Sequence, residues 1–580
     1  MIDGYLVGCE NLMKKEKYSE AINGFSYILK LDRTSIQAYR GMALSHSKLG
    51  NWAEALTYSL NGLHHGKNQT GDLALLLDIL ELSSLREYIV HLEAPLMAAL
   101  KNPRLSLKAY NMLGLQIALK HNSVFSNFSQ SLTYNKEIEQ LIFDKSYCRL
   151  LEMSVVSDYL VEEILLVVRR EVLKLASLNK DISKYLPFLT SLGCQTLLND
   201  GLYYTSKEEA LLLENINLNT DKIVRGEQPQ QMRVEHLLLL LCYSSFEDSM
   251  AIWRNNEEIL RSNGETNLVL DLEFYSNVLS SRNGYLIKRD TSKKVQSFYM
   301  ENPYPKWKMA GFSSVEVAQD LKQYEAKIES IPAILIAGCG TGKQVIEIAL
   351  CNPKSNILAI DITPTSIKYA QVMANKYGIT NVEFKLLDIL DLKELNKEFD
   401  YIICTGVLHH MASPEDGLNV LESVLSENGY MLLAFYSSAA RRELSDLRTD
   451  LFSFSNVDES SITRELVKKW RRQLDITIKT SELSKTADFY FLNGLYDLLL
   501  HPQEKEYSLN EIRNMLGMSG LEYVKMKLKL NKRTELQAVL KRNPISKEGD
   551  TLDYWSDIEK IYPPTFINMY TFLVTRVLDR

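Results

Sequence analysis

The 580-residue chain has few cysteines, and their positions exclude two common ways of stabilising a fold. The seven cysteines are scattered, odd in number and never arranged as C-x-x-C. This pattern argues against a disulfide framework and gives no sign of a structural zinc site. We therefore expect reduced thiols in a cytoplasmic protein, and the spacing of potential ligands predicts no metal site.

Long apolar runs are also missing. The longest tight run, LLLLLCY at residues 237–243, is too short to cross a bilayer and predicts a buried helix. Asp3 and Glu10 interrupt the apolar residues at the start of the sequence, which argues against a secretory signal. We expect no membrane insertion.

An excess of basic residues is lacking as well. The chain has 66 Lys and Arg against 73 Asp and Glu, a formal net charge of −7, and no long basic stripe with interleaved aromatics. A nucleic-acid partner is therefore not predicted. A chain of this length that is 46% hydrophobic and 24% charged can bury several cores, so we expect two to four domains.

The first seventy residues contain an internal repeat. Tyr18 and Trp52 are 34 residues apart, and so are Ala21 and Ala55. This period, with an aromatic residue three places before alanine, is typical of the paired antiparallel helices of tetratricopeptide repeats. Two repeats cannot be stable alone and must pack against the next part of the chain; an accidental pair of amphipathic helices is the alternative.

The rest of the chain divides into four parts that differ in their pattern of apolar residues. Residues 71–285 have apolar positions at three- and four-residue spacing and predict a helical middle domain. Residues 286–438 alternate continuous apolar runs with helical patterns, which predicts a parallel sheet covered by helices. Residues 439–519 form a helical insert, and residues 520–580 supply the last strands of a seven-stranded, Rossmann-like domain. The predicted fold class is multidomain, α plus α/β.

The segment from Ile334 to Asp361 carries the strongest functional signal. An apolar run is followed by glycines at 338, 340 and 342, a helical pattern, a second apolar run and then the aspartate. Glycines let the backbone turn sharply and approach a ligand, and an acidic side chain after the next strand can accept hydrogen bonds from ribose hydroxyls. An adenosine-bearing cofactor is predicted. The glycines alone fit a dinucleotide, a methyl donor or an ordinary tight turn.

Two later segments favour the methyl donor. The third apolar run ends at Asp388 and Ile389, and the fourth leads into GVLHH. Together with GCGTG and Asp361, these segments resemble class I S-adenosylmethionine-dependent methyltransferases. The resemblance implies that the cofactor S-adenosylmethionine is held by Gly338, Cys339, Gly340 and Gly342 at its methionine part, Asp361 and Ile362 at the ribose, Asp388 and Ile389 at the adenine, and Gly406 near the sulfonium. Tyr299, in an aromatic segment upstream, is a further candidate for contacting the cofactor. A nicotinamide site would place its third glycine two residues further on.

A second resemblance begins at SFYMENPYPKW, residues 297–307. Its two prolines predict a stiff loop rather than a helix or strand. It resembles the N-P-Y-P-R-W segment of bacterial proteins that join tetratricopeptide repeats to a methyltransferase domain, with Lys306 in place of arginine. The likeness continues in CQTLLND, DFYFLNGLYDLLLHPQE and YPPTFINMYTFLV. Relatives with an assigned substrate are rickettsial-type methyltransferases that modify lysines of outer-membrane protein.

The resemblance implies methyl transfer to a lysine of a protein substrate, such as an outer-membrane or surface protein gripped by the repeats. A lysine, with a pKa of about 10.4 in water, must lose its proton before it can attack, and desolvation by aromatic walls favours this. The predicted catalytic residues are Tyr304, Trp307, Tyr436 and His409, with His410 as an alternative proton acceptor. Asp488, Tyr490, Asn493 and Asp497 of the insert are candidates for lining the acceptor side, or else caps and surface positions.

Two other functions remain open from the sequence. One is a methyltransferase with a small-molecule or glycan acceptor, in which the helical half serves to form a homodimer. The other is a scaffold that binds the donor without turnover. Ala337 keeps this second possibility open, because many members of the family have an acidic residue at that position. Without it, the donor's amino group needs another ligand, such as the Gly338 or Gly406 carbonyl.

Overall fold

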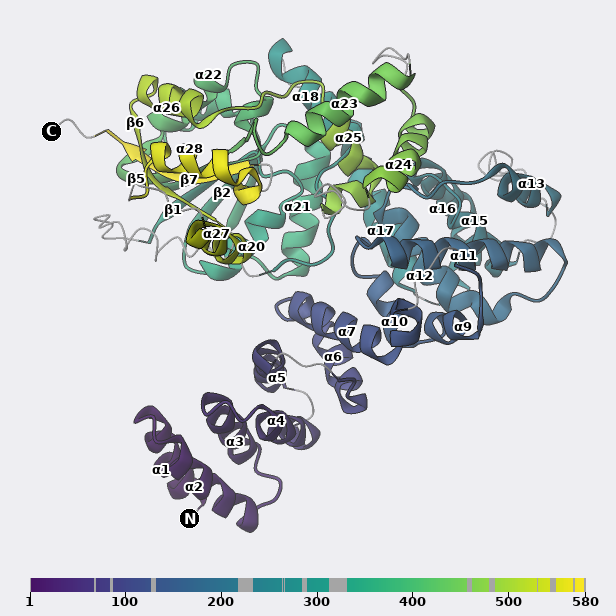
Figure 1. The fold of residues 1–580 in the computed structure, drawn as a ribbon, viewed down its shortest axis with the longest axis vertical. Coiled ribbons are helices and arrows are strands. Elements are labelled where there is room, and N and C mark those ends of the chain that lie inside the picture. Colours follow the sequence, from purple (N-terminus) through teal and green to yellow (C-terminus); the bar gives the residue numbers. More distant parts are fainter. Residues whose placement is uncertain are drawn as a thin grey trace.

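The computed structural model (Figure 1) describes residues 2–66, 69–83, 87–126, 132–216, 233–262, 264, 266–283, 289–311, 331–455, 462–478, 486–528, 530–542, 549–566 and 569–577. Within these ranges, no helix combines the length and the apolar character needed to span a bilayer.

The N-terminal half of the chain is helical. Its first helices are α1 (Ile2–Lys14), α2 (Tyr18–Leu31), α3 (Ile36–Lys48), α4 (Trp52–Gly66) and α5 (Thr70–Ser83). The repeated positions Tyr18 and Trp52 open α2 and α4, so the period in the sequence corresponds to equivalent helices. Gly41 shows why small residues occur where helices touch: a Cβ there would lie 2.2 Å from the Phe25 ring.

The helical middle part comes next. Its elements are η1 (Val90–Leu92), α6 (Glu93–Ala99), α7 (Ser106–Lys120), α8 (Asn122–Ser126), α9 (Lys136–Ile142), α10 (Lys145–Leu151), α11 (Tyr159–Ser177), η2 (Ser183–Tyr185), α12 (Leu186–Leu198), α13 (Lys207–Asn215), α15 (Val234–Leu241), α16 (Phe246–Arg261), α17 (Asn267–Leu279) and η3 (Ser280–Asn283). As predicted, the five leucines of the LLLLLCY run, residues 237–241, lie in a buried helix, α15, which Cys242 caps. In Figure 1 these helices lie between the N-terminal repeats and the sheet domain.

The C-terminal half contains a seven-stranded sheet in the order β3-β2-β1-β4-β5-β7-β6. Its strands are β1 (Ala333–Ala337), β2 (Asn356–Asp361), β3 (Val382–Leu386), β4 (Phe399–Thr405), β5 (Leu425–Tyr436), β6 (Leu521–Met526) and β7 (Met569–Arg576). The first five strands run parallel, and β7 is antiparallel to both of its neighbours. This arrangement confirms the predicted Rossmann-like class I methyltransferase fold.

The continuous apolar runs are explained by burial on both faces of the sheet. In β1, Ile334 and Ile336 join one core, while Leu335 and Ala337 join the core on the other face. The covering elements are α20 (Lys343–Cys351), α21 (Pro364–Lys376), η4 (Ile389–Leu395), η5 (Leu408–His410), α22 (Pro414–Ser423), α26 (Leu509–Met518), α27 (Leu530–Arg542), α28 (Leu552–Ile561) and η9 (Pro563–Phe566). Parallel strands β1 to β4 therefore end at one edge of the sheet.

The predicted insert is helical. It contains α23 (Arg442–Ser455), α24 (Arg464–Ile478), η8 (Ala487–Tyr490) and α25 (Leu492–Leu500). Figure 1 shows α23, α24 and α25 beside the middle helices. There Arg471 donates to both carboxylate oxygens of Glu162, at 2.6 and 2.7 Å, and neither side chain is exposed. The insert thus packs against both the sheet domain and the middle helices.

The segment 297–307 differs from the predicted loop. Helix α18 (Asp290–Glu301) includes residues 297–301, and the loop begins only at Asn302. A proline restricts the residue before it, so Pro303 forces Asn302 out of the helical region but leaves the preceding turn free. The prediction was wrong for these five residues.

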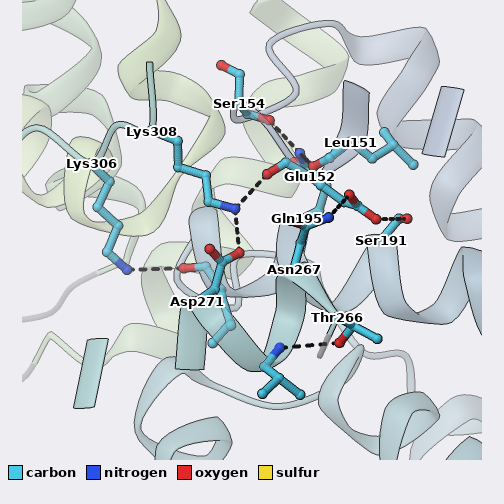
Figure 2. A network of polar contacts seen from close by, with 12 residues as sticks. Leu151, Glu152, Ser154, Ser191, Gln195, Thr266, Asn267, Asp271, Lys306 and Lys308 are labelled. Carbon is cyan, nitrogen blue, oxygen red and sulfur yellow. Dashed lines mark hydrogen bonds and ion pairs between the residues drawn. The ribbon is translucent and has the colours of Figure 1, made fainter. Parts of the chain in front are cut away.

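Residues 302–311, which we call the strap, join the two halves of the chain. Figure 2 shows Lys308 reaching Asp271 on α17 and the backbone carbonyl of Glu152, the latter at 2.6 Å. Lys306 forms a buried ion pair with Asp200. The strap is therefore anchored in the middle helices by two lysines.

Candidate functional site

A cavity of about 550 Å³ opens at the carboxyl ends of β1 to β4. Parallel α/β sheets bind ligands at this edge, where the strand order reverses. The predicted site residues on its wall are Tyr299, Tyr304, Gly338, Cys339, Gly340, Asp361, Ile362, Asp388, Ile389, Gly406 and Tyr436. Segments that lie far apart in the sequence therefore form one site.

At two positions of the loop after β1, neighbouring atoms lie so close to the backbone that only glycine fits. Gly338 has φ +72° and a Cβ there would lie 2.3 Å from Val407. Gly340 has φ +51° and a Cβ there would lie 2.8 Å from the carbonyl oxygen of Tyr304. Because any side chain would collide at these positions, the loop presents bare backbone to the cavity.

Gly342 lies outside the cavity wall. It has φ +84°, and a Cβ there would lie 2.5 Å from the Ala370 Cβ on α21. Its role in this structure is to let α20 start close to α21. Gly342 was predicted to contact the methionine part of the cofactor, and the structure does not place it on the cavity wall.

Two acidic residues lie at the ends of β2 and β3. Asp361 accepts hydrogen bonds from the backbone N–H groups of Gly340 and Thr363, both at 2.8 Å, and burial raises its pKa. Asp388 accepts from the Leu390 N–H at 3.0 Å and from the Ser292 hydroxyl at 2.7 Å. Both carboxylates are fixed in place, as ligands for ribose and adenine groups must be.

Helix α18 closes one side of the cavity. Ser292, Val295 and Tyr299 on this helix line the wall. Of these three, only Tyr299 was predicted from the sequence, because the prediction rested on the segment 297–307, which Ser292 and Val295 precede. The spacing of these three residues, three and then four positions apart, is typical of one face of a helix and could have predicted that they lie together.

Helix α20 contributes polar groups that the sequence reasoning missed. Lys343, Gln344 and Glu347 all line the cavity. Glu347 accepts from the Gly311 N–H at 3.0 Å, and burial raises its pKa. Residues 343 and 347 are one helical turn apart, so they lie on the same face of the helix. Their position directly after the glycine loop could have predicted that this face lines the cavity.

The far end of the cavity is acidic and aromatic. The Tyr299 hydroxyl donates to Asp497 at 2.7 Å, and the Tyr304 hydroxyl donates to Asp488 at 2.9 Å. Burial raises the pKa of Asp488 and raises that of Asp497 to about 7. The ring of Tyr436 completes this end of the wall. These contacts join the insert to the strap and α18.

Two predicted catalytic residues lie outside the wall. The Trp307 indole donates to the Thr341 carbonyl at 3.2 Å and packs near Tyr369 of α21. His409 is fully buried, with its ring centroid 3.9 Å from that of Tyr436. Because consecutive residues of a 3-10 helix point in different directions, only one histidine of the pair lines the cavity, and it is His410.

Comparison with known proteins identifies the class of the sheet domain. Residues 332–485 match the family described as "Methyltransferase domain". The predicted cofactor, S-adenosylmethionine, is confirmed by this match. The glycine cradle and the fixed carboxylates of Asp361 and Asp388 fit that group.

Individual relatives cover only part of the chain. An uncharacterised protein of Synechococcus sp. is 30% identical over 203 residues, 33% of this chain and 48% of that protein. An uncharacterised protein of Rickettsia prowazekii is 36% identical over 104 residues, 18% of this chain and 42% of that protein. A tRNA U34 carboxymethyltransferase of Campylobacter fetus is 33% identical over 97 residues, 17% and 33% respectively. The chain thus spans less than half the length of these relatives.

Solved structures show a similar partial likeness. PKMT2 from Rickettsia typhi in complex with AdoHcy has 20% identity and a TM-score of 0.34, covering 48% of this chain and 55% of that one.

Proposed function

We propose that this protein transfers a methyl group from S-adenosylmethionine to an amine, the side chain of a lysine in a protein substrate. The observation that carries the proposal is the end of the cavity lined by Tyr299, Tyr304 and Asp497, with Asp488 bound to the Tyr304 hydroxyl outside the wall. The choice of a protein acceptor comes from the sequence resemblance to lysine methyltransferases.

The donor end explains how the cofactor would be held. Asp361 and Asp388 offer carboxylate oxygens to the nucleoside, and the bare backbone at Gly338 and Gly340 admits the amino-acid part. Glu347 supplies a carboxylate that the chain lacks at Ala337, and it can accept from the donor's amino group. When bound, the cofactor supplies a methyl group already activated by the sulfonium. The protein must then align the acceptor and exclude water.

The acceptor end favours an amine over other nucleophiles. Burial, together with the nearby charge of Asp488, raises the pKa of Asp497, and a cation that enters the cavity beside Asp497 lowers the free energy of its ionised form. Tyrosine faces tolerate both the ammonium and its methylated product. A carboxylic acid or a phosphate-bearing acceptor would meet like charge there. A nucleic-acid acceptor, as in the tRNA-modifying relative, is disfavoured for the same reason.

The test is methyl transfer from tritiated S-adenosylmethionine to fractionated bacterial lysate, including an outer-membrane protein fraction. We expect label in a protein band as methyl-lysine, which survives acid hydrolysis. Asp361→Ala should lose donor binding in calorimetry and all labelling, while the exposed control Asp450→Asn should keep both. Label only in small molecules or glycans would favour the alternative acceptor class. Donor binding by the wild type without any transfer would favour a scaffold and overturn the proposal.

A further inference from the structure

Three buried groups lie together at the acceptor end of the cavity. One ring nitrogen of His410, one of His501 and a carboxylate oxygen of Asp497 are all within 4.8 Å of one another. His410 and Asp497 line the cavity, and His501 is 5% exposed behind them.

The backbone of Gln503 fixes the protonation of both rings. Its carbonyl oxygen lies 3.1 Å from His410 Nδ1, and because a carbonyl can only accept, Nδ1 carries the proton and Nε2 keeps a lone pair. Its N–H donates to His501 Nδ1 at 3.2 Å, so in neutral His501 the proton is on Nε2. That buried Nε2–H has no hydrogen-bond partner among the described residues.

This arrangement suits proton transfer better than metal binding. The two rings stack, with centroids 3.8 Å apart and planes inclined by 32°. Stacked imidazoles direct their ring nitrogens side by side, whereas a shared metal needs lone pairs that converge. In neutral His501, Nε2 carries a proton, and Nδ1 already accepts from the Gln503 N–H. The three groups therefore offer a carboxylate, an acceptor and a donor.

The charged surroundings of Asp497 decide where a proton rests. The groups that face it are Tyr299, which donates a hydrogen bond, the acidic side chains of Asp488 and Glu504, and the Arg441 guanidinium. Burial raises the pKa of Asp497 to about 7. Burial lowers the pKa of His501 to about 4 and that of His410 well below its ordinary value. Near neutral pH Asp497 is therefore partly ionised and can take up a proton, while both histidines are neutral.

We propose that Asp497 is the catalytic base of methyl transfer and that His410 Nε2 is the next acceptor of the proton. The inference rests on the proposed amine methylation. The acceptor enters as R–NH3⁺, one N–H bond breaks and an O–H bond forms on Asp497. The freed lone pair forms the N–C bond while the S–C bond breaks, and the product leaves as a methylammonium.

The experiment measures single-turnover labelling of the outer-membrane protein fraction as a function of pH, beside donor affinity by calorimetry. For Asp497→Asn we expect unchanged donor affinity, a rate at least about 100-fold lower at pH 7, and a rise of about tenfold per pH unit, because the amine must then lose its proton to solvent. His410→Asn keeps a donor for the Gln503 carbonyl but lacks Nε2, and we expect an intermediate loss. The exposed control Asp450→Asn should behave like the wild type.

Two results would overturn the inference. One is an Asp497→Asn pH profile parallel to that of the wild type, which would mean that the side chain only shapes the site. The other is full activity of His410→Asn, which would remove the second proton acceptor. Asp497→Glu keeps the carboxyl should the asparagine variant fail to fold, and its pH profile should keep the shape of the wild-type profile. Absence of amine methylation by the wild type at every pH would instead remove the proposed function itself.

Discussion

Gly340 shows how a single missing side chain can hold a site together. Its φ of +51° already favours glycine, and a Cβ would press on the Tyr304 carbonyl at 2.8 Å. That carbonyl accepts the Thr341 N–H at 3.3 Å, so the glycine loop and the strap meet backbone to backbone. The position therefore couples two walls of the cavity.

We expect Gly340→Ala to weaken binding of S-adenosylmethionine at least about tenfold, because the strap must move away from the loop. Gly378→Ala is the matched control, since Gly378 also has a positive φ of +64° but no atom within 4 Å of a built Cβ. Both variants should lose roughly 1–2 kcal/mol of unfolding free energy from backbone strain. Calorimetry and urea unfolding check this, and equal donor affinity in the two variants would contradict it.

The raised pKa of Asp497 predicts how the stability of the protein depends on pH. Its pKa is raised to about 7 in the folded protein, above its value in the unfolded chain, so the folded state binds the proton more tightly. The contribution of Asp497 to stability should then be largest at low pH and be lost as the pH rises from about 4 to about 7, by up to roughly 4 kcal/mol. In Asp497→Asn without ligand this fall should be absent. Urea unfolding of both proteins between pH 5 and 8 measures it, and parallel curves would refute the assignment.

At the scale of elements, the strap links the cofactor loop to the helices of the N-terminal half. On one side the Thr341 hydroxyl and N–H donate to the Pro305 and Tyr304 carbonyls. On the other, Lys306 pairs with Asp200, donates to the Leu197 carbonyl at 3.1 Å and lies 3.9 Å from the centre of the Phe246 ring. Any shift of the middle helices is therefore transmitted to the cavity wall.

Lys306→Met should cost about 3–5 kcal/mol of unfolding free energy, because it leaves the Asp200 carboxylate buried without its cation. The double variant Lys306→Met with Asp200→Asn should recover part of that loss. Lys17→Met, which removes the exposed pair with Glu20, should cost less than about 1 kcal/mol. Thermal or urea unfolding of the four proteins provides the comparison, and equal losses at Lys306 and Lys17 would contradict a buried pair.

The sequence could predict the elements that depend on local pattern. The strands are predictable from apolar runs buried on both faces, and Gly338, Gly340, Asp361 and Asp388 from their place at strand ends. The contact of Gly342 with Ala370 could not be predicted, since it depends on how α20 packs against α21. The choice of His410 over its neighbour depends likewise on the orientation of η5 and on Gln503, 93 residues away.

At the scale of the whole molecule, buried apolar side chains connect the domains. One continuous cluster runs from Ala43 of α3 and Ala55 of α4 through the middle helices to Trp307, Tyr369 and other residues beside the sheet. The first repeat has a smaller cluster of its own: Cys9, Ala21, Phe25, Ile28, Ala38 and Met42. The first two helices are thus the part of the repeats that is least tied to the site.

This difference gives a way to test whether the repeats grip the substrate. Deleting residues 2–31 removes α1 and α2 but leaves the larger cluster intact. We expect donor affinity within about twofold of the full chain and continued labelling of short lysine peptides. Labelling of the intact protein acceptor should fall at least about tenfold, because its attachment site is lost. Equal labelling of the intact acceptor by both proteins would show that the first repeat plays no part in capture, and loss of donor binding would show that it supports the fold of the site instead.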